Sequence, residues 1–71
     1  MRTSLEELYT QYEHSIEKQK RTIEENRQKL KEAHLKHNLA EVARLNILLR
    51  TLYEEKLEME SAATGIREYF H

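Results

Sequence analysis

Apolar residues recur every three or four positions in two long runs that are separated near the midpoint of the chain. With the polar residues that share this spacing included, the first run consists of Leu5, Tyr9, Tyr12, Ile16, Gln19, Ile23, Asn26, Leu30 and Ala33. The second run consists of Val42, Leu45, Leu49, Leu52, Lys56, Met59, Ala63, Ile66 and Phe70. This spacing is the a/d pattern of heptad repeats, and no segment shows the alternation of a strand. The pattern therefore predicts two amphipathic helices and an all-α fold.

The boundary between the two helices is marked by capping signals. Asn38 and Glu41 fit the N-x-x-E form of a capping box, in which Asn38 accepts a hydrogen bond from the Glu41 backbone N–H and the Glu41 side chain bonds back to the Asn38 N–H. Lys36 and His37, just upstream, are cations of the kind that favour a helix C-terminus. We expect a first helix over about 4–36, a turn at 37–38 and a second helix over about 39–70.

Folding the chain back at residue 37 brings the two runs into register. In an antiparallel hairpin the numbers of facing residues add up to a constant, and a constant of 75 pairs every position of the first run with one of the second, such as Leu30 with Leu45. The sequence therefore predicts one domain, residues 1–71, folded as a coiled-coil-like antiparallel two-helix hairpin. The register also indicates that the second helix continues past Gly65, although a helix that ends with Gly65 as its C′ residue is an open alternative.

The second helix carries more apolar surface than one seam can cover. Leu39, Leu48, Tyr53 and Leu57 flank its seam, so that apolar positions span about half of its circumference at about 100° per residue. A contiguous exposed apolar surface on a small protein usually marks an interface. We therefore expect these four residues to form an oligomer interface, in a homodimer that makes a four-helix bundle or in a higher homo-oligomer.

Charge is distributed unevenly along the predicted hairpin. Residues 18–50 hold nine Lys/Arg and four Glu, a net charge of +5, whereas residues 1–17 and 51–71 each have a net charge of −3. The half near the turn is therefore basic, and the open end of the hairpin is acidic. Two such hairpins attract each other when they lie side by side and head to tail, within the screening length of about 8–10 Å at ordinary salt.

Composition narrows the classes of function. The 71 residues include one Gly and no Pro or Cys, which excludes a disulfide framework and thiolate chemistry. No stretch approaches the roughly 20 apolar residues of a membrane span, and the acidic N-terminus lacks the apolar core of a signal peptide. We expect a cytoplasmic protein that does not associate with membranes.

Candidate catalytic and metal-binding groups are few. The chain has no Gly-rich loop, no Asp and no Ser paired with a His at a convincing position, so we expect no enzymatic activity and no cofactor. His34 and His37 have the i,i+3 spacing of a chelating pair, with Glu41 across the turn. A stable site needs three or four ligands, and two solvated histidines near a helix C-terminus are the simpler interpretation.

Three polar residues, Gln19, Asn26 and Lys56, interrupt the apolar seam. Polar residues at a and d positions fix the register and oligomeric state of coiled coils at some cost in stability. A polar contact for a ligand or a partner inside a bundle is the alternative interpretation.

Residues 46–50, Asn-Ile-Leu-Leu-Arg, lie in the second predicted helix. They belong to a segment, residues 23–53, whose layout is loosely similar to that of the small sporulation aspartyl-phosphate phosphatases. That family carries an acidic catalytic residue in its second helix, after a Ser-x-x-Leu motif. Because Arg50 stands at the position of the acid, the catalytic residue is missing and we do not assign the chain to that family.

Two further surfaces are candidates for partner binding. An aromatic patch at the open end would suit a partner protein, unless it is simply core, because Tyr and Phe are enriched at interfaces. It consists of Tyr9, Tyr12, Tyr69 and Phe70. Basic residues near the turn are candidate phosphate contacts for RNA or DNA. They are Lys18, Arg21, Arg27, Lys29, Lys31, Lys36, Arg44 and Arg50.

These patterns favour a small non-catalytic helical hairpin that acts as a protein–protein interaction or regulatory module through homo-oligomerisation. The alternative is a small nucleic-acid-binding regulator that uses the basic half near the turn, although acidic residues are interleaved there and no aromatic platform lies among them.

Overall fold

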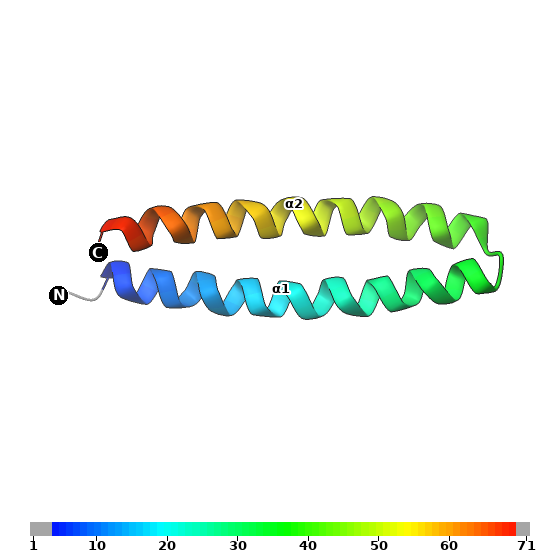
Figure 1. Ribbon diagram of the computed structural model, residues 1–71, viewed down its shortest axis with the longest axis horizontal. Coiled ribbons are helices and arrows are strands. Elements are labelled where there is room, and N and C mark those ends of the chain that lie inside the picture. The colour runs from blue at the N-terminus through cyan, green and yellow to red at the C-terminus, as the bar shows by residue number, and fades with distance from the viewer. Residues whose placement is uncertain (1–3, 70–71) are drawn as a thin grey trace.

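The protein is a helical hairpin. The computed structural model describes residues 4–69, which form helix α1 (Ser4–Leu35, 32 residues) and helix α2 (Leu39–Tyr69, 31 residues). The helices run antiparallel and pack side by side, so that the ends of α1 and α2 farthest from the turn lie together at one end of a rod (Figure 1). The rod measures 54 × 15 × 14 Å. The predicted antiparallel two-helix hairpin is thus confirmed.

The turn closes α1 with a backbone motif that uses His37 in the left-handed conformation, at φ 56°. The Asn38 N–H donates to the Ala33 carbonyl at 2.9 Å, and the His37 N–H donates to the His34 carbonyl at 3.1 Å. These two bonds define a Schellman motif with His37 at C′, a position where Gly is the usual residue. The motif ends α1 at Leu35, one residue before the predicted boundary.

Asn38 also begins α2, where half of the predicted capping box is present. Its side-chain Oδ1 accepts a hydrogen bond from the Glu41 N–H at 3.2 Å, as predicted. The prediction of a reciprocal hydrogen bond from the Asn38 N–H to the Glu41 side chain is wrong, because the Asn38 N–H donates to the Ala33 carbonyl. The Glu41 carboxylate instead accepts hydrogen bonds from the Arg44 guanidinium, one of them from Nε at 2.8 Å.

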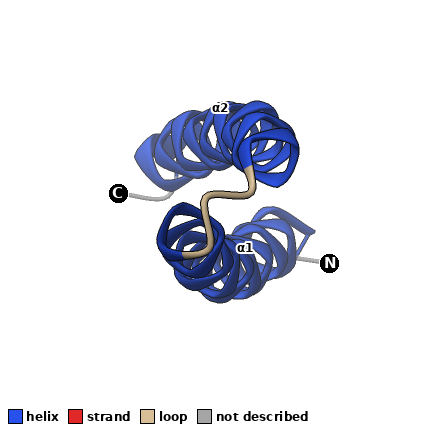
Figure 2. Ribbon diagram, turned by 90° about the vertical axis from the view of Figure 1, so that its right-hand side faces the viewer, coloured by secondary structure: helices blue, strands red, loops and turns tan. Residues whose placement is uncertain are grey.

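The interior of the hairpin follows the predicted register. Every described seam position from Tyr9 to Ala33 and from Val42 to Ile66 is buried or half-buried. Ile23, Leu49 and Leu52 form the central cluster, against which Leu30 and Leu48 pack. At the open end Leu5 is exposed, and its predicted partner Phe70 lies outside the described residues. Figure 2, viewed along the rod, shows the two helices crossing at an angle.

α2 continues through Gly65, as the register indicates, so Gly65 is not a C′ residue. Its backbone does not adopt a positive φ, and a Cβ added there would meet no atom within 4 Å. Gly65 therefore lies on the open outer side of a regular helix, where its missing side chain has no structural purpose that the hairpin explains.

The polar layer of the seam is satisfied by the hairpin itself. Gln19 Nε2 donates across the seam to the Leu52 carbonyl at 3.2 Å and to Glu55 Oε1 at 2.9 Å. Asn26 is buried and donates to the Thr22 carbonyl at 2.8 Å. Within residues 4–69 no buried side-chain nitrogen or oxygen is left without a hydrogen-bond partner. Gln19 in particular connects the two helices, as expected of a residue that fixes register.

Candidate oligomer interface

Large apolar side chains are exposed on the outer side of the hairpin. They are Leu5, Leu8, Leu35, Leu39, Ile47, Tyr53, Leu57 and Tyr69. On α2 the exposure is considerable, with Leu39 at 78% and Leu57 at 62%. Single exposed apolar residues are common on proteins, but a row of them along one helix usually marks an interface.

Three of the exposed apolar residues of α2, Leu39, Tyr53 and Leu57, belong to a second heptad series beside the seam. At about 100° per residue, Leu57 lies about 120° around α2 from the buried Leu45. We call this series the outer stripe. It consists of Leu39, Ala43, Asn46, Arg50, Tyr53, Leu57, Glu60 and Thr64. Its members recur with alternating spacings of four and three, which is the pattern of a helix that has a second partner.

Three of the four predicted interface residues lie on this outer stripe, and the fourth does not. Leu39, Tyr53 and Leu57 are exposed, whereas Leu48 is half-buried and packs against the central cluster of the hairpin. Leu48 lies about 140° around the helix from Tyr53 at about 100° per residue. Leu48 therefore stabilises the hairpin itself. Sequence reasoning also missed the polar members of the stripe, which only the heptad spacing could have revealed.

An open groove lies beside the outer stripe, near the end of the rod away from the turn. Its volume is about 590 Å³. It is lined by Tyr9, Glu13, Ile16, Glu17, Lys20, Glu60, Ala63, Thr64 and Arg67. The Lys20 ammonium lies 3.7 Å from the Glu17 carboxylate. The ammonium of the seam residue Lys56 lies 3.2 Å from the Glu60 carboxylate. We call this feature the open-end groove.

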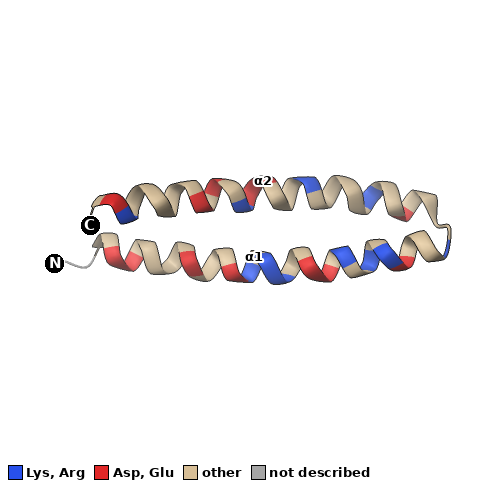
Figure 3. Cartoon of the chain, viewed as in Figure 1, with Lys and Arg blue, Asp and Glu red and all other residues tan. Residues whose placement is uncertain are grey.

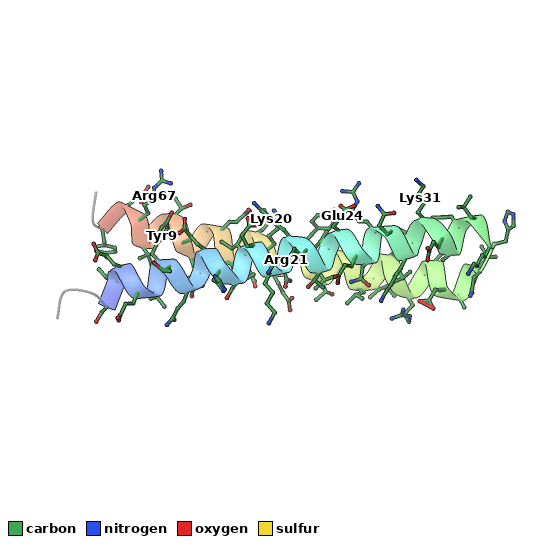
Figure 4. The ribbon with its side chains drawn as sticks, turned by 90° about the horizontal axis from the view of Figure 1, so that it is seen from below. Tyr9, Lys20, Arg21, Glu24, Lys31 and Arg67 are labelled. Carbon is green, nitrogen blue, oxygen red and sulfur yellow. The ribbon has the colours of Figure 1, made fainter. Side chains whose placement is uncertain are left out.

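Basic side chains flank the stripe from its middle toward the turn. Arg27 donates to the Tyr53 hydroxyl at 3.4 Å, which places its guanidinium next to the outer stripe. Figure 4 shows Lys31, near the turn, and Arg67, at the open end, projecting from the same side of the hairpin. In Figure 3 the basic residues concentrate toward the turn and the acidic residues toward the open end. The rod as a whole is therefore more basic toward the turn and more acidic toward the open end.

The candidate phosphate contacts do not share one face. All eight are exposed, from Lys18 to Arg50. Lys18 and Arg27 are nine positions apart on α1, which places them about 180° apart around the helix at about 100° per residue. Arg44 is already paired with Glu41 within α2. Nucleic-acid binding stays a prediction, and a mobility-shift titration at low and moderate salt tests it.

Two described members of the predicted aromatic patch lie on different flanks of the seam. Tyr9 and Tyr12 are half-buried and line different grooves, Tyr9 the open-end groove and Tyr12 a groove with Gln19 and Met59 on the other flank. Tyr69 is 81% exposed, and Phe70 lies outside the described residues. The described tyrosines therefore do not form a single docking surface.

The candidate metal ligands are exposed and lie around the turn. His34 lines a groove beside Arg27 and Lys31, and His37 occupies the left-handed position of the turn. Within residues 4–69 no three His, Cys, Asp or Glu side chains are arranged so that they could hold a metal ion. Among the same residues, neither helix has the length and apolar character needed to span a bilayer.

Comparison with known proteins adds no relative to this picture. No protein-family model, no curated protein and no solved structure matches the chain.

Proposed function

We propose that this protein is a non-catalytic interaction module that acts through homo-oligomerisation. The observation that carries the proposal is the outer stripe, a second heptad series with Leu39, Tyr53 and Leu57 exposed beside a seam that is already occupied. A helix with apolar residues on more than one side is typical of a helix packed between partners.

The surface of the isolated hairpin supports the same conclusion. Its accessible area is 5708 Å² for a mass of 8.6 kDa. A compact monomer of that mass exposes about 4,700 Å² on the general scaling of surface with mass. The excess of about 1,000 Å² is close to the roughly 800 Å² that each partner buries in a stable protein–protein interface. Pairing with a second copy would therefore bring the exposed surface to an ordinary value.

The small core of the hairpin gives a physical reason for self-association. The buried apolar side chains of the described residues are Ile23, Ala33, Leu45, Leu49, Leu52 and Ala63. A core of this size is marginal for a chain below about 70–80 residues, which usually needs a disulfide, a metal or a partner. The chain has no Cys, so a disulfide does not supply that support.

Sedimentation equilibrium over a range of about 1–500 μM tests the proposal. We expect the wild type to shift from monomer to dimer in this range and Leu57→Lys to stay monomeric, because the lysine must desolvate its charge at the interface. Ile47→Lys is the matched control, since Ile47 is 63% exposed and Leu57 is 62% exposed on the same helix. Ile47 lies outside the stripe, so this variant should dimerise as the wild type does.

The outcomes separate the alternatives. A wild type that is monomeric at the highest concentration contradicts the proposal. If both lysine variants dissociate equally, the exposed apolar surface of α2 acts without a defined stripe, and the assignment of the interface to Leu39, Tyr53 and Leu57 is wrong.

A further inference from the structure

Two long helices that pack antiparallel on a heptad series pair their a positions with d positions of the partner. On the outer stripe, Asn46, Tyr53 and Glu60 occupy one position of the heptad, and Arg50, Leu57 and Thr64 occupy the other. A register in which the numbers of facing residues add up to 110 pairs these six residues with one another. Tyr53 then faces Leu57, Arg50 faces Glu60, and Asn46 faces Thr64.

From this register we infer that a second copy of the chain docks head to tail on the outer stripe, with Tyr53 of each copy against Leu57 of the other. The inference rests on the proposed function and adds the orientation, the register and the pairs of residues. Tyr53 and Leu57 flank the middle of α2, which runs from Leu39 to Tyr69. The register therefore overlays the two α2 helices along nearly their whole length and pairs the stripe from Asn46 to Thr64.

Charge complementarity supports the head-to-tail direction. The register places Arg50 of one copy opposite Glu60 of the other, on both sides of the two-fold axis. It also places the basic half near the turn, with Arg27 beside Tyr53, over the open-end groove of the second copy, where three glutamates outnumber Lys20 and Arg67. The reverse arrangement, turn against turn, would bring together two segments of net charge +5. Like charges at close range oppose that arrangement.

The pairs also fit the anatomy of a stable interface. The aromatic–aliphatic pair Tyr53–Leu57 occurs twice at the centre, where desolvated aromatic anchors contribute most of the binding free energy. The ion pair and the small polar pair lie farther out, where solvent reaches them. Arg27 donates to the Tyr53 hydroxyl at 3.4 Å, which places a cation beside the central pair.

Disulfide trapping tests the register directly, because the chain has no Cys and an introduced thiol is therefore the sole one. A Tyr53→Cys chain and a Leu57→Cys chain are mixed and oxidised mildly. The two chains are made different in length, so that their heterodisulfide differs in size from either homodisulfide. We expect the heterodisulfide between them to exceed the Leu39→Cys homodisulfide at least tenfold. In the head-to-tail register the two copies of residue 39 lie about 48 Å apart along the axis at about 1.5 Å per residue, far beyond the reach of a disulfide.

A second pair protects the test against a weakened centre. A mixture of Asn46→Cys and Thr64→Cys chains should also form more heterodisulfide than Leu39→Cys forms homodisulfide. These substitutions leave Tyr53 and Leu57 intact. Sedimentation under reducing conditions establishes that each variant still dimerises.

Each outcome has a distinct meaning. If Leu39→Cys cross-links with itself as readily as the mixed pairs do, the copies lie turn to turn and the head-to-tail inference is overturned while the proposed function stands. If the wild type dimerises but neither mixed pair is preferred, the interface lies off the outer stripe. If the wild type is monomeric in sedimentation, the proposed function and this inference fail together.

Discussion

At the scale of single residues, the turn offers the clearest test of local physics. His37 adopts a φ of 56° at the C′ position of α1, where a side chain with a Cβ costs about 1–2 kcal/mol. Glycine avoids this cost but loses more entropy on folding, about 0.4–1 kcal/mol. We therefore expect His37→Gly to raise the free energy of unfolding by about 0.5–1 kcal/mol, as measured by urea denaturation.

The matched control for this substitution is His34→Gly. His34 lies three residues earlier, in the regular last turn of α1. There glycine should lower the stability by up to about 1 kcal/mol, because it is a poor helix former. A lower stability for His37→Gly as well would mean that the imidazole contributes to the turn in a way that the left-handed backbone does not account for.

The residue scale is also where the sequence was least informative. The N-x-x-E motif correctly located the start of α2, but it could not show that the Asn38 N–H was committed to the Ala33 carbonyl. That commitment depends on the left-handed conformation of His37, and histidine is only a weak signal for this conformation. The position of Leu48 is ambiguous in the sequence for a similar reason. Its position beside the seam fitted either a core or an interface, and only its packing against the central cluster decides.

At the scale of the helices, Gly65 gives the next prediction. It lies within α2 at an ordinary helical position, and an added Cβ would meet no atom within 4 Å. Gly65→Ala should therefore raise the free energy of unfolding by about 0.5–1 kcal/mol, the usual difference between the two residues in a helix interior. Thermal denaturation followed by circular dichroism measures it.

Ser61→Gly is the control for Gly65→Ala. Ser61 is exposed one turn earlier on the same helix, so glycine there should lower the stability by a few tenths of a kcal/mol. If Gly65→Ala is neutral or destabilising while Ser61→Gly behaves as expected, Gly65 has a partner that the isolated hairpin does not contain.

The helices themselves were predictable because several local signals agree. The 3–4 spacing, the absence of Pro and the Asn38 cap all indicate two long helices with a reversal near residue 37. A constant sum of 75 then fixes their register, and the burial of Ile23 opposite Leu52 follows from it. The sequence could not fix the polar layer in the same way. Gln19 bonds to both Leu52 and Glu55 across the seam, a choice that depends on the distance between the helices.

At the scale of the whole molecule, the candidate interface was only partly visible in the sequence. The sequence shows more apolar residues on the second helix than one seam can bury. It does not show on which side of the seam these residues are exposed. Flank positions on opposite sides of a seam look alike until the burial of each is known. The basic residues illustrate the same limit. They are concentrated between Lys18 and Arg50 in the sequence, but the helical geometry places them on different sides of the rod.

The effect of Arg50→Glu on the dissociation constant of the dimer is expected to have opposite signs in the head-to-tail and turn-to-turn orientations. Arg50→Glu would place a glutamate opposite Glu60 of the second copy at two symmetric positions, one on each side of the two-fold axis. With each exposed ion pair contributing about 0.2–1 kcal/mol and the like-charge contact costing a similar amount, we expect the dissociation constant of the dimer to rise about tenfold. The double variant Arg50→Glu with Glu60→Arg should recover most of the loss, and both effects should shrink at high salt. In a turn-to-turn dimer the basic halves already repel each other, so Arg50→Glu would tighten the dimer instead. Sedimentation equilibrium of the three proteins at two salt concentrations therefore decides the orientation by the sign of the change.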